Sequence, residues 1–376
     1  MSMEHQFERG SHYSASTPDT AKGRLPEAQK IAVLRANTLG DFLFTLPALV
    51  ALNKTYPQAE IVLLGLSWHA TFLKDRPSPI KRVIAIPPYG GVGKDPGYQA
   101  DESELTAFFA EMQRERFDLA LQLHGGGRYS NVFLNRLGAR TTAGLRTPDA
   151  PQLDRWLPYI YFQHEVLRSQ EIVGLVGANE GHAEIGIEPK LTVTAADLEA
   201  AEVVIPTTPQ PLVVIHPGAS DPRRRWSPRN FAAIGDMLAE QGAKILVTGS
   251  DSERALVSEV VRTMHAPAYD LSGQLSINAL TGLLARCRLV VANDTGPRHL
   301  ANAVGTPTVS IYWCINLLNA GPLTRQYHRP HVSWRLECPT CGKHCLPDTC
   351  SHTTSLVDDV TIDEVSESAY DLYYTQ

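Results

Sequence analysis

The stretch that decides the fold is IAVLRANTLGDFLFTLP, residues 31–47. An apolar run, IAVLR, leads into a short loop with Gly40 and then into a helical pattern over about 41–56. A strand, a loop and a helix in this order form the first half of a βαβ unit, which builds a parallel sheet. The sequence therefore predicts an α/β fold that starts close to residue 27.

The same alternation continues outward from this stretch in two blocks. The first block adds the strand-like runs EIVLLGL, VIAIP and LALQLHGGG and a helix near 102–116. The second block has the runs LVVIHPGAS, KILVTGS, LVVAND and TPTVSIYW, with helices over about 228–241, 252–264, 277–285 and 296–304. Open α/β sheets bind ligands beyond the carboxyl ends of their strands, so the residues after each run are the candidates for function.

The domain boundaries follow from this pattern. We predict a disordered tail over 1–26, an N-terminal Rossmann-like domain over 27–185 and a C-terminal Rossmann-like domain over 186–360. A final helix over 361–376 is expected to pack back on the N-terminal domain. The total of 376 residues fits two domains of the usual size, roughly 100–200 residues each.

Composition excludes several classes of protein. Apolar residues make up 43% and charged residues 20%, which is typical of a folded chain, and the net charge of −6 argues against a general nucleic-acid binder. The sequence has no run of about 18 apolar residues, so no membrane helix is predicted. Its first residues lack the apolar core of a signal peptide. We expect a cytoplasmic protein. Peripheral contact with the cytoplasmic face of the membrane is compatible with this expectation.

The first candidate cluster is TLGD, residues 38–41, after the first strand. Gly40 would allow a tight turn, and Asp41 opens the helix. One interpretation makes Asp41 a helix cap, because Asp is favoured at such positions, and the other makes it a general base. The loop lacks G-x-G-x-x-G, so a nicotinamide cofactor is not expected.

The second cluster is HPGASDPRRRWSP, residues 216–228. Its three arginines precede a helix that begins near Ser227, and guanidinium groups and free helix amides both favour a phosphate. The alternative is a solvated basic loop. TGSD, residues 248–251, follows the next strand, and Asp251 there either accepts from ribose hydroxyls or caps the following helix.

The most specific motif is NDTGPRHLA, residues 293–301. It follows a strand and opens a helix whose first amides can face a ligand, with His299 near the first turn. A lone histidine at such a position is commonly structural, but here it accompanies Asp294 and Thr295.

These motifs, in the order LGDxxxTLP, HPGA with RRW, GSxxERA and NDTGPxHLA, resemble those of the family 9 glycosyltransferases, the heptosyltransferase group, from about residue 30 onward. The resemblance implies a GT-B architecture of two facing Rossmann-like domains with a cleft between them. It also implies an N-terminal acceptor domain, a C-terminal nucleotide-sugar domain, inversion at the anomeric carbon, and no metal or other cofactor.

The resemblance makes Asp41 the catalytic carboxylate. It implies these donor-binding residues: Gly218, Arg224, Arg225, Ser250, Asp251, Asp294, Thr295, Gly296 and His299. Of the three loop arginines we choose Arg225 as the main contact with the diphosphate. Thr38, Gly40, His124 and Arg128 are the candidates for acceptor binding, although the glycine-rich run after His124 is equally compatible with a flexible turn. Arg298 departs from the small or apolar residue expected before His299, which leaves the donor sugar open.

The implied partners are a nucleotide-diphosphate sugar, ADP-heptose by family default, and a glycan or glycolipid acceptor such as lipopolysaccharide core. A nucleotide-sugar epimerase on the same scaffold is an alternative that the LGDxxxTLP motif argues against. A non-catalytic glycan or nucleotide binder is a second alternative, against which Asp41 argues.

Four cysteines, Cys338, Cys341, Cys345 and Cys350, gather near the end of the chain with His344 and His352. Their spacing could bind zinc. Because similar stretches occur in the resembled family without a recognised catalytic metal, we assign the cluster a structural or incidental role and no metal to the active site.

Overall fold

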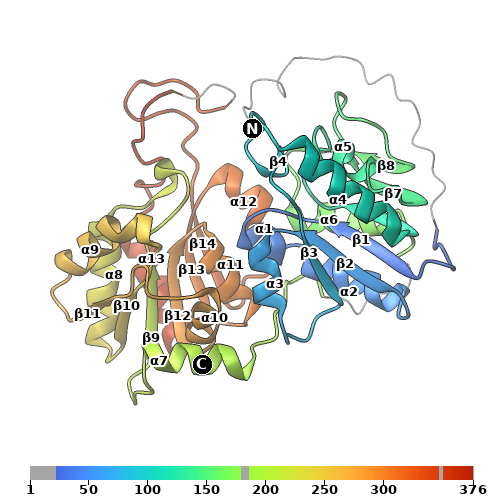
Figure 1. Cartoon of the computed structure of the whole chain (residues 1–376). Helices are drawn as coiled ribbons and strands as arrows, with labels where there is room; N and C mark the ends of the chain where they lie inside the picture. Colours follow the sequence, from blue (N-terminus) through green and yellow to red (C-terminus); the bar gives the residue numbers. More distant parts are fainter. Residues whose placement is uncertain (1–22, 179–185, 347–349, 376) are drawn as a thin grey trace. The chain divides into compact units, whose positions relative to one another are not determined.

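The computed structural model describes residues 23–178, 186–346 and 350–375 (Figure 1). These residues divide into two compact units after Pro189, close to the predicted boundary between residues 185 and 186. Most of the predicted tail, residues 1–22, lies outside the described residues. Its last part, 23–26, is bound to the first unit, because the Gly23 carbonyl accepts from Arg155 and the Leu25 N–H donates to the Tyr56 hydroxyl.

The first unit is built on a six-stranded parallel sheet in the order β3-β2-β1-β6-β7-β8. Its strands are β1 (Lys30–Leu34), β2 (Glu60–Gly65), β3 (Arg82–Ala85), β6 (Leu119–Gln122), β7 (Thr141–Arg146) and β8 (Arg155–Pro158). The central strand β1 pairs with β2 on one side and β6 on the other. It is apolar and buried from Ile31 to Leu34, as expected for a strand of a sheet that helices cover on both faces. A two-stranded sheet, β4 (Tyr89–Gly90) and β5 (Gly93–Lys94), lies in the connection after β3.

The helices of the first unit are α1 (Leu39–Leu43), α2 (Leu46–Thr55), α3 (Ser67–Leu73), α4 (Glu102–Glu115), α5 (Ser130–Asn135) and α6 (Glu165–Gly174). The single helix predicted over 41–56 is therefore wrong, since α1 and α2 are separate. The break falls just before Pro47, which lies in the first turn of α2. Proline has no N–H to donate and clashes with the preceding turn, so it is tolerated at a helix start but not within a continuous helix.

The second unit repeats the same sheet topology, in the order β11-β10-β9-β12-β13-β14. Its strands are β9 (Leu212–His216), β10 (Lys244–Val247), β11 (Ala268–Asp270), β12 (Cys287–Asn293), β13 (Thr308–Trp313) and β14 (His328–Ser333). Its helices are α7 (Ala195–Val204), α8 (Pro228–Glu240), α9 (Arg254–Thr263), α10 (Ile277–Ala285), α11 (Gly296–Ala303), α12 (Cys314–Ala320) and α13 (Ile362–Tyr374), with 3₁₀ turns η2 (Pro222–Arg224) and η3 (Asp251–Glu253).

Both sheets thus have the strand order of a Rossmann fold, and the predicted pair of Rossmann-like units is confirmed. In this order the chain reverses its direction of winding between the first and fourth strands. That point is β1 beside β6 in the first unit and β9 beside β12 in the second. Ligands of open α/β sheets bind at this point, beyond the carboxyl ends of the strands.

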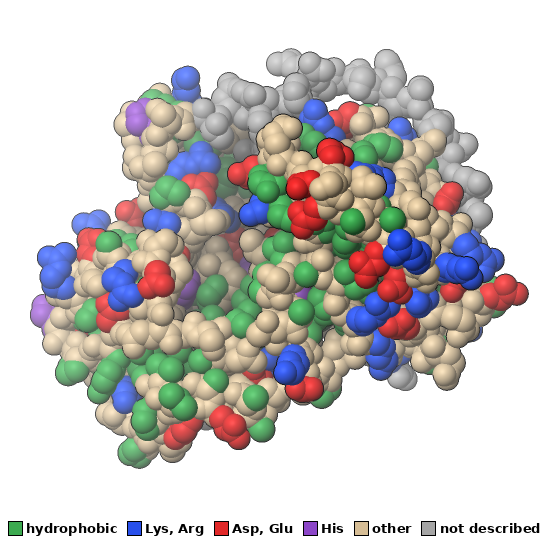
Figure 2. Space-filling model, viewed as in Figure 1, with side chains coloured by type: hydrophobic (Ala, Val, Ile, Leu, Met, Phe, Trp, Pro, Cys, Tyr) green, Lys and Arg blue, Asp and Glu red, His purple; other side chains and the backbone are tan. Residues whose placement is uncertain are grey.

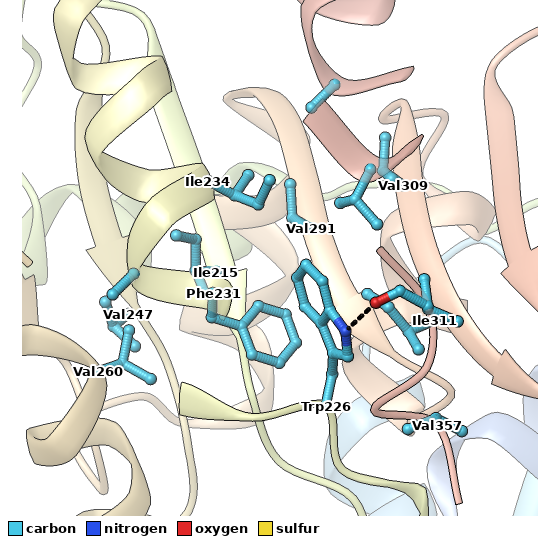
Figure 3. Close-up of a cluster of buried hydrophobic side chains, with 14 of the residues drawn as sticks. Ile215, Trp226, Phe231, Ile234, Val247, Val260, Val291, Val309, Ile311 and Val357 are labelled. Carbon is cyan, nitrogen blue, oxygen red and sulfur yellow. Dashed lines mark hydrogen bonds between the residues drawn. The ribbon is translucent and has the colours of Figure 1, made fainter. Parts of the chain in front are cut away.

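The core of the second unit holds a fully buried tryptophan, Trp226, at the end of the arginine-rich loop. Figure 3 shows its indole packed edge-on against Phe231, among aliphatic side chains of the sheet and of α8. The indole Nε1–H donates to the Val360 carbonyl at 2.9 Å, so the polar atom of the ring is satisfied within the core. Trp226 therefore fixes one end of the loop that carries the three arginines.

The final helix, α13, does not follow the prediction. Its buried side chains Val365, Ala369, Leu372 and Tyr373 belong to the core of the second unit, where α13 contacts α8 and the strands β12, β13 and β14. The expectation that this helix packs back on the N-terminal domain is wrong. The physical reason is that its apolar stripe completes the cover of the second sheet, on the same face as α8.

The described surface carries both signs of charge. Figure 2 shows Lys and Arg side chains beside Asp and Glu side chains on the face in view. One such group is the ion-pair network of Lys30 and Arg82 with Glu60 and Glu115, near the amino ends of three strands. Among the described helices, none has both the length and the apolar composition needed to cross a bilayer.

Candidate active-site residues in the two units

Asp41 lies in the first turn of α1, directly beyond the carboxyl end of β1. The residue at the N-cap position is Thr38, so the cap interpretation of Asp41 is wrong. The Asp41 carboxylate accepts from the Thr38 hydroxyl at 2.9 Å and from the Arg35 guanidinium at 3.2 Å. Its side chain remains 32% exposed, so a bound molecule can still reach it.

Arg35 holds this carboxylate in place, and sequence reasoning missed it. Its side chain is only 3% exposed and forms a second ion pair with Glu165 at 3.2 Å. It also donates to the Leu123 carbonyl at the end of β6 and to the backbone carbonyl of Asp41. A charged residue at the end of an otherwise buried strand was the available signal, because such a residue needs a partner nearby.

His124 connects the two loops at the switch point of the first unit. Its Nδ1 accepts from the Ala36 N–H at 3.2 Å, which joins the loop after β6 to the loop after β1. Burial and, second to it, the positive charge of Arg35 lower the pKa of His124 to about 3, against the opposing effects of Asp41 and of a hydrogen bond to the Gly91 backbone. The ring is therefore neutral with its proton on Nε2, because Nδ1 is the acceptor.

The other two residues expected at the acceptor site behave differently. Gly40 is buried within α1 in an ordinary helical conformation, so the tight turn proposed for it is not found. Arg128 is exposed and pairs with Asp149 at 3.4 Å, and its guanidinium lies over the ring of Tyr129.

In the second unit, Asn293 joins the loops after β9 and β12. Its side-chain amide donates to the Pro217 carbonyl at 2.8 Å, and its side-chain oxygen accepts from the Trp226 N–H at 3.1 Å. Asn293 is fully buried. The sequence placed it within the motif but gave it no role, because its partners are far away along the chain.

Asp294 is the centre of a buried charged group. One carboxylate oxygen lies 3.2 Å from the Arg224 guanidinium, and the other lies 3.1 Å from His299 Nε2. Burial alone would raise the pKa of Asp294, but His299, Arg224 and Arg298 outweigh burial and lower it. Asp294 is therefore ionised, and it fixes one arginine and one histidine at the start of α11.

Arg298 determines which ring nitrogen of His299 carries the proton. Its guanidinium is almost fully buried and donates to His299 Nδ1 at 2.9 Å and to the Ala320 carbonyl at 2.9 Å. With Nδ1 as the acceptor, the ring proton is on Nε2, the nitrogen that lies 3.1 Å from Asp294. Two further nitrogens of Arg298, Nε and Nη1, have no hydrogen-bond partner among the described residues.

Thr295 and Gly296 form the start of α11. Thr295 is its extended N-cap residue and Gly296 its first residue, followed by Pro297. The amides of a first helical turn have no partner within the helix and carry the positive end of the helix dipole. This helix start can therefore accept an anion beside the Asp294 group.

The three loop arginines occupy different environments. The Arg223 side chain donates three hydrogen bonds to the Asp221 carboxylate, the shortest at 2.7 Å. Arg224 pairs with Asp294, and Arg225 donates twice to the Ala219 carbonyl, at 2.7 and 2.9 Å. The expected difference between these side chains is thus visible in their partners.

Glu253, which sequence reasoning did not select, lies against the backbone of Gly218. A Cβ atom at Gly218 would be 2.0 Å from Glu253 Oε1, so any larger residue there would displace the Glu253 carboxylate. Glu253 accepts from the Ser250 N–H and hydroxyl, both at 2.8 Å. Burial raises the pKa of Glu253, but Ser250, His216 and Arg225 outweigh burial and lower it.

Asp251, the expected ribose ligand, lies outside this group. Its side chain is 81% exposed and pairs with Arg254 at 2.7 Å. It is the first residue of η3, which Ser250 and not Asp251 caps. The acidic residue that this loop directs toward Gly218 is therefore Glu253.

The two units thus offer complementary chemistry at equivalent points. The first offers an accessible carboxylate with a neutral histidine nearby, a set suited to removing a proton from a hydroxyl. The second offers arginines, a helix start and a buried Asp–His pair, a set suited to a phosphate-bearing ligand.

Comparisons with known proteins agree with this arrangement. A family model described as glycosyltransferase family 9 (heptosyltransferase) matches residues 105–346. The chain is 23% identical over 305 residues to the lipopolysaccharide core heptosyltransferase OpsX of Haemophilus influenzae, which covers 79% of this chain and 82% of that protein.

Two solved structures share the fold. A family 9 glycosyl transferase from Veillonella parvula matches with a TM-score of 0.75 and 19% identity, covering 93% of this chain and 98% of that one. The ADP-heptose lps heptosyltransferase II of E. coli matches with a TM-score of 0.73 and 19% identity, covering 92% and 98%.

Proposed function

The chain belongs to glycosyltransferase family 9, and on that premise we propose that it transfers a heptose from ADP-heptose to a hydroxyl of a glycan or glycolipid acceptor. The family assignment gives the reaction class, and the names of the relatives suggest the donor and a lipopolysaccharide-core acceptor. The observation that carries the proposal is the Arg224–Asp294–His299 group at the start of α11, where an arginine and the first helix amides lie together, which supports a diphosphate site there.

In this proposal the second unit binds the donor. Arg225 and Arg224 contact the diphosphate, the first amides of α11 complete its cradle, and His299 and Thr295 lie beside the sugar. Gly218 and Ser250 let the nucleotide approach the backbone, and the ribose is recognised by an acidic residue of η3. Since Asp251 is exposed and paired with Arg254, Glu253 is the better placed candidate for that last role.

The first unit then binds the acceptor and supplies the base. Asp41 removes the proton from the acceptor hydroxyl while its oxygen forms a bond to the anomeric carbon. The bond from that carbon to the diphosphate oxygen breaks on the opposite face, ADP leaves, and the configuration inverts. Thr38 and Arg35 orient the carboxylate, and His124 accepts from the Ala36 N–H and so fixes the loop that carries Asp41.

The negative charge that develops on the leaving diphosphate needs stabilisation. Fixed arginines and helix amides can supply it without reorganising during the reaction. We therefore propose that turnover needs no divalent ion. We place the enzyme in the cytoplasm, with peripheral contact at the cytoplasmic face of the membrane where a lipid-linked acceptor would lie.

The decisive experiment incubates the full chain with a panel of nucleotide sugars, with and without lipopolysaccharide-core acceptor, and follows nucleotide release. Release of ADP from ADP-heptose only in the presence of acceptor, at the same rate with and without added Mg²⁺, would support the proposal. Conversion of the nucleotide sugar without acceptor would indicate an epimerase. Binding without turnover of any donor would indicate a non-catalytic homologue.

A further inference from the structure

The segment between β14 and α13 brings four potential metal ligands together. The Sγ atoms of Cys338, Cys341 and Cys350 and one ring nitrogen of His352 all lie within 4.8 Å of one another. Cys345, which the sequence spacing places in the same row, is not part of this group and is buried in the core of the second unit. The structure therefore selects three cysteines and one histidine from a run of six candidates.

The backbone around the first two cysteines is shaped for chelation. Gly342 follows Cys341 with a φ of +71°, a conformation that favours glycine. Its N–H donates to the Cys338 carbonyl at 2.9 Å, and the Cys338 N–H donates to the Lys343 carbonyl at 2.8 Å. This closed turn places both thiols of the C-x₂-C pair within reach of one ion.

The distances fit a tetrahedral ion. Zinc binds thiolate sulfur at about 2.3 Å and imidazole nitrogen at about 2.0–2.1 Å, so ligand atoms in a tetrahedral site are about 3.5–3.8 Å apart. Cys338 Sγ lies 3.8 Å from His352 Nδ1. Because no pair of the four ligand atoms exceeds 4.8 Å, a contraction of about 1 Å at most would complete the site.

We propose that Cys338, Cys341, Cys350 and His352 bind one Zn²⁺ ion in a structural site. Three thiolates and one imidazole are a zinc donor set. All four tetrahedral positions are then taken by the protein, which leaves none for a substrate or a water molecule. A filled coordination shell is the mark of a structural rather than a catalytic zinc.

The position of the site indicates what the ion would stabilise. Directly after His352, the chain runs along the arginine loop and binds it at four points. These contacts are the Ser355 hydroxyl to the Arg225 carbonyl (2.7 Å), the Leu356 N–H to the Arg223 carbonyl (2.7 Å), the Ser227 N–H to the Asp358 carboxylate (2.8 Å) and the Trp226 indole to the Val360 carbonyl (2.9 Å).

The ion would therefore fix the segment that in turn supports the arginine loop. This consequence for donor binding rests on the proposed function, whereas the metal site itself does not. Disorder in this segment would weaken the hydrogen bonds that support the arginine loop, which predicts a loss of about tenfold in affinity for ADP.

The first test measures zinc and iron in the full chain, purified under reducing conditions and saturated with zinc before desalting. Wild type and Cys345→Ser should each hold one zinc ion per chain, and Cys338→Ser and Cys341→Ser should hold at least tenfold less. Cys345→Ser is the matched control, because it removes a buried thiol from the same segment. Loss of zinc in Cys345→Ser with retention in His352→Asn would overturn the ligand set, and iron in place of zinc would overturn the identity of the ion.

Two measurements on wild type keep the test decisive if a variant does not fold. Cobalt should replace zinc and give the visible spectrum of a tetrahedral site with sulfur ligands, and zinc should protect three thiols from a thiol reagent. An unchanged number of reactive thiols with and without zinc would overturn the proposal.

The second test compares ADP binding by the zinc-loaded chain and by the same chain after chelation. Binding should weaken about tenfold and recover when zinc is restored. Unchanged ADP affinity would overturn the supporting role of the ion. If neither form binds ADP, the proposed function fails while the zinc content still stands.

Discussion

The substitution Asp41→Asn separates catalysis from structure. The carboxylate accepts from Thr38 and Arg35, and the oxygen of asparagine can accept one of these hydrogen bonds in the same place. What the substitution removes is the negative charge and the ability to take a proton. The shape of the side chain and the start of α1 are kept.

The magnitudes follow from the surroundings of Asp41. A positioned general base contributes about 10²–10⁴-fold in rate, so turnover should fall by about that factor, equivalent to about 2.7–5.5 kcal/mol in activation free energy. Stability should change little. The Asp41 side chain is 32% exposed and Arg35 keeps its second partner Glu165, so the lost ion pair is worth about 1 kcal/mol or less.

The assay measures turnover with ADP-heptose and acceptor, ADP binding and melting temperature for each variant. Glu165→Gln is the matched control, because it removes the other carboxylate on Arg35 without removing the proposed base. We expect unchanged ADP affinity in both variants and a large loss of turnover only in Asp41→Asn. Turnover within tenfold of wild type in Asp41→Asn, or an equal loss in Glu165→Gln, would refute the assignment.

Three further predictions concern the second unit and the buried histidines. Alanine substitution of the loop arginines should weaken donor binding most at Arg225, by about 10–100-fold, and least at Arg223, which Asp221 already holds; equal small effects would favour a solvated loop. Gly218→Ala should weaken ADP binding about tenfold because its Cβ would displace Glu253, whereas Gly97→Ala, which has open space around it, should have no effect on titration with ADP. Burial lowers the pKa of His69 and of His328 to about 4, so both stay neutral in the folded state while the unfolded chain takes up protons below about 6.5. The free energy of unfolding should therefore fall as pH drops from about 6.5 to about 4, by up to about 1.4 kcal/mol per pH unit for each histidine. His69→Gln should flatten this slope in urea unfolding; an unchanged slope would contradict the prediction.

Elements with strong local signals could be predicted from the sequence. The helix expected over 277–285 is α10; the apolar runs chosen as strands contain β2, β6, β9, β10 and β13 and overlap β1 and β12. β14 was missed because its sequence, HRPHVS, has little apolar character. A strand of that composition forms only because β13 offers it a full row of partners.

The site was predictable where its residues follow a strand and was missed where partners are distant. The motif residues Asp41 and Asp294 do lie at the switch points of their sheets. Arg35 escaped notice because its partner Glu165 is 130 residues away, and the support of Trp226 by Val360 spans 134 residues. No local pattern reports such pairs, since they depend on how the sheet returns the chain to the same edge.

The two units solve the same structural problem in the same way. At each switch point two loops leave neighbouring strands, and each must be fixed if side chains are to be aimed at a ligand. In the first unit the His124 ring accepts from the backbone of the opposite loop, and in the second the Asn293 amide bonds to the opposite loop twice. In both cases a polar side chain at the end of β6 or β12 holds the loop that follows the neighbouring strand, β1 or β9. The residues that bind these loops are therefore as necessary to each site as those that face a ligand. A conservative substitution of Asn293 should shift the positions of the Arg224 and Asp294 side chains, although the Asn293 side chain bonds to neither.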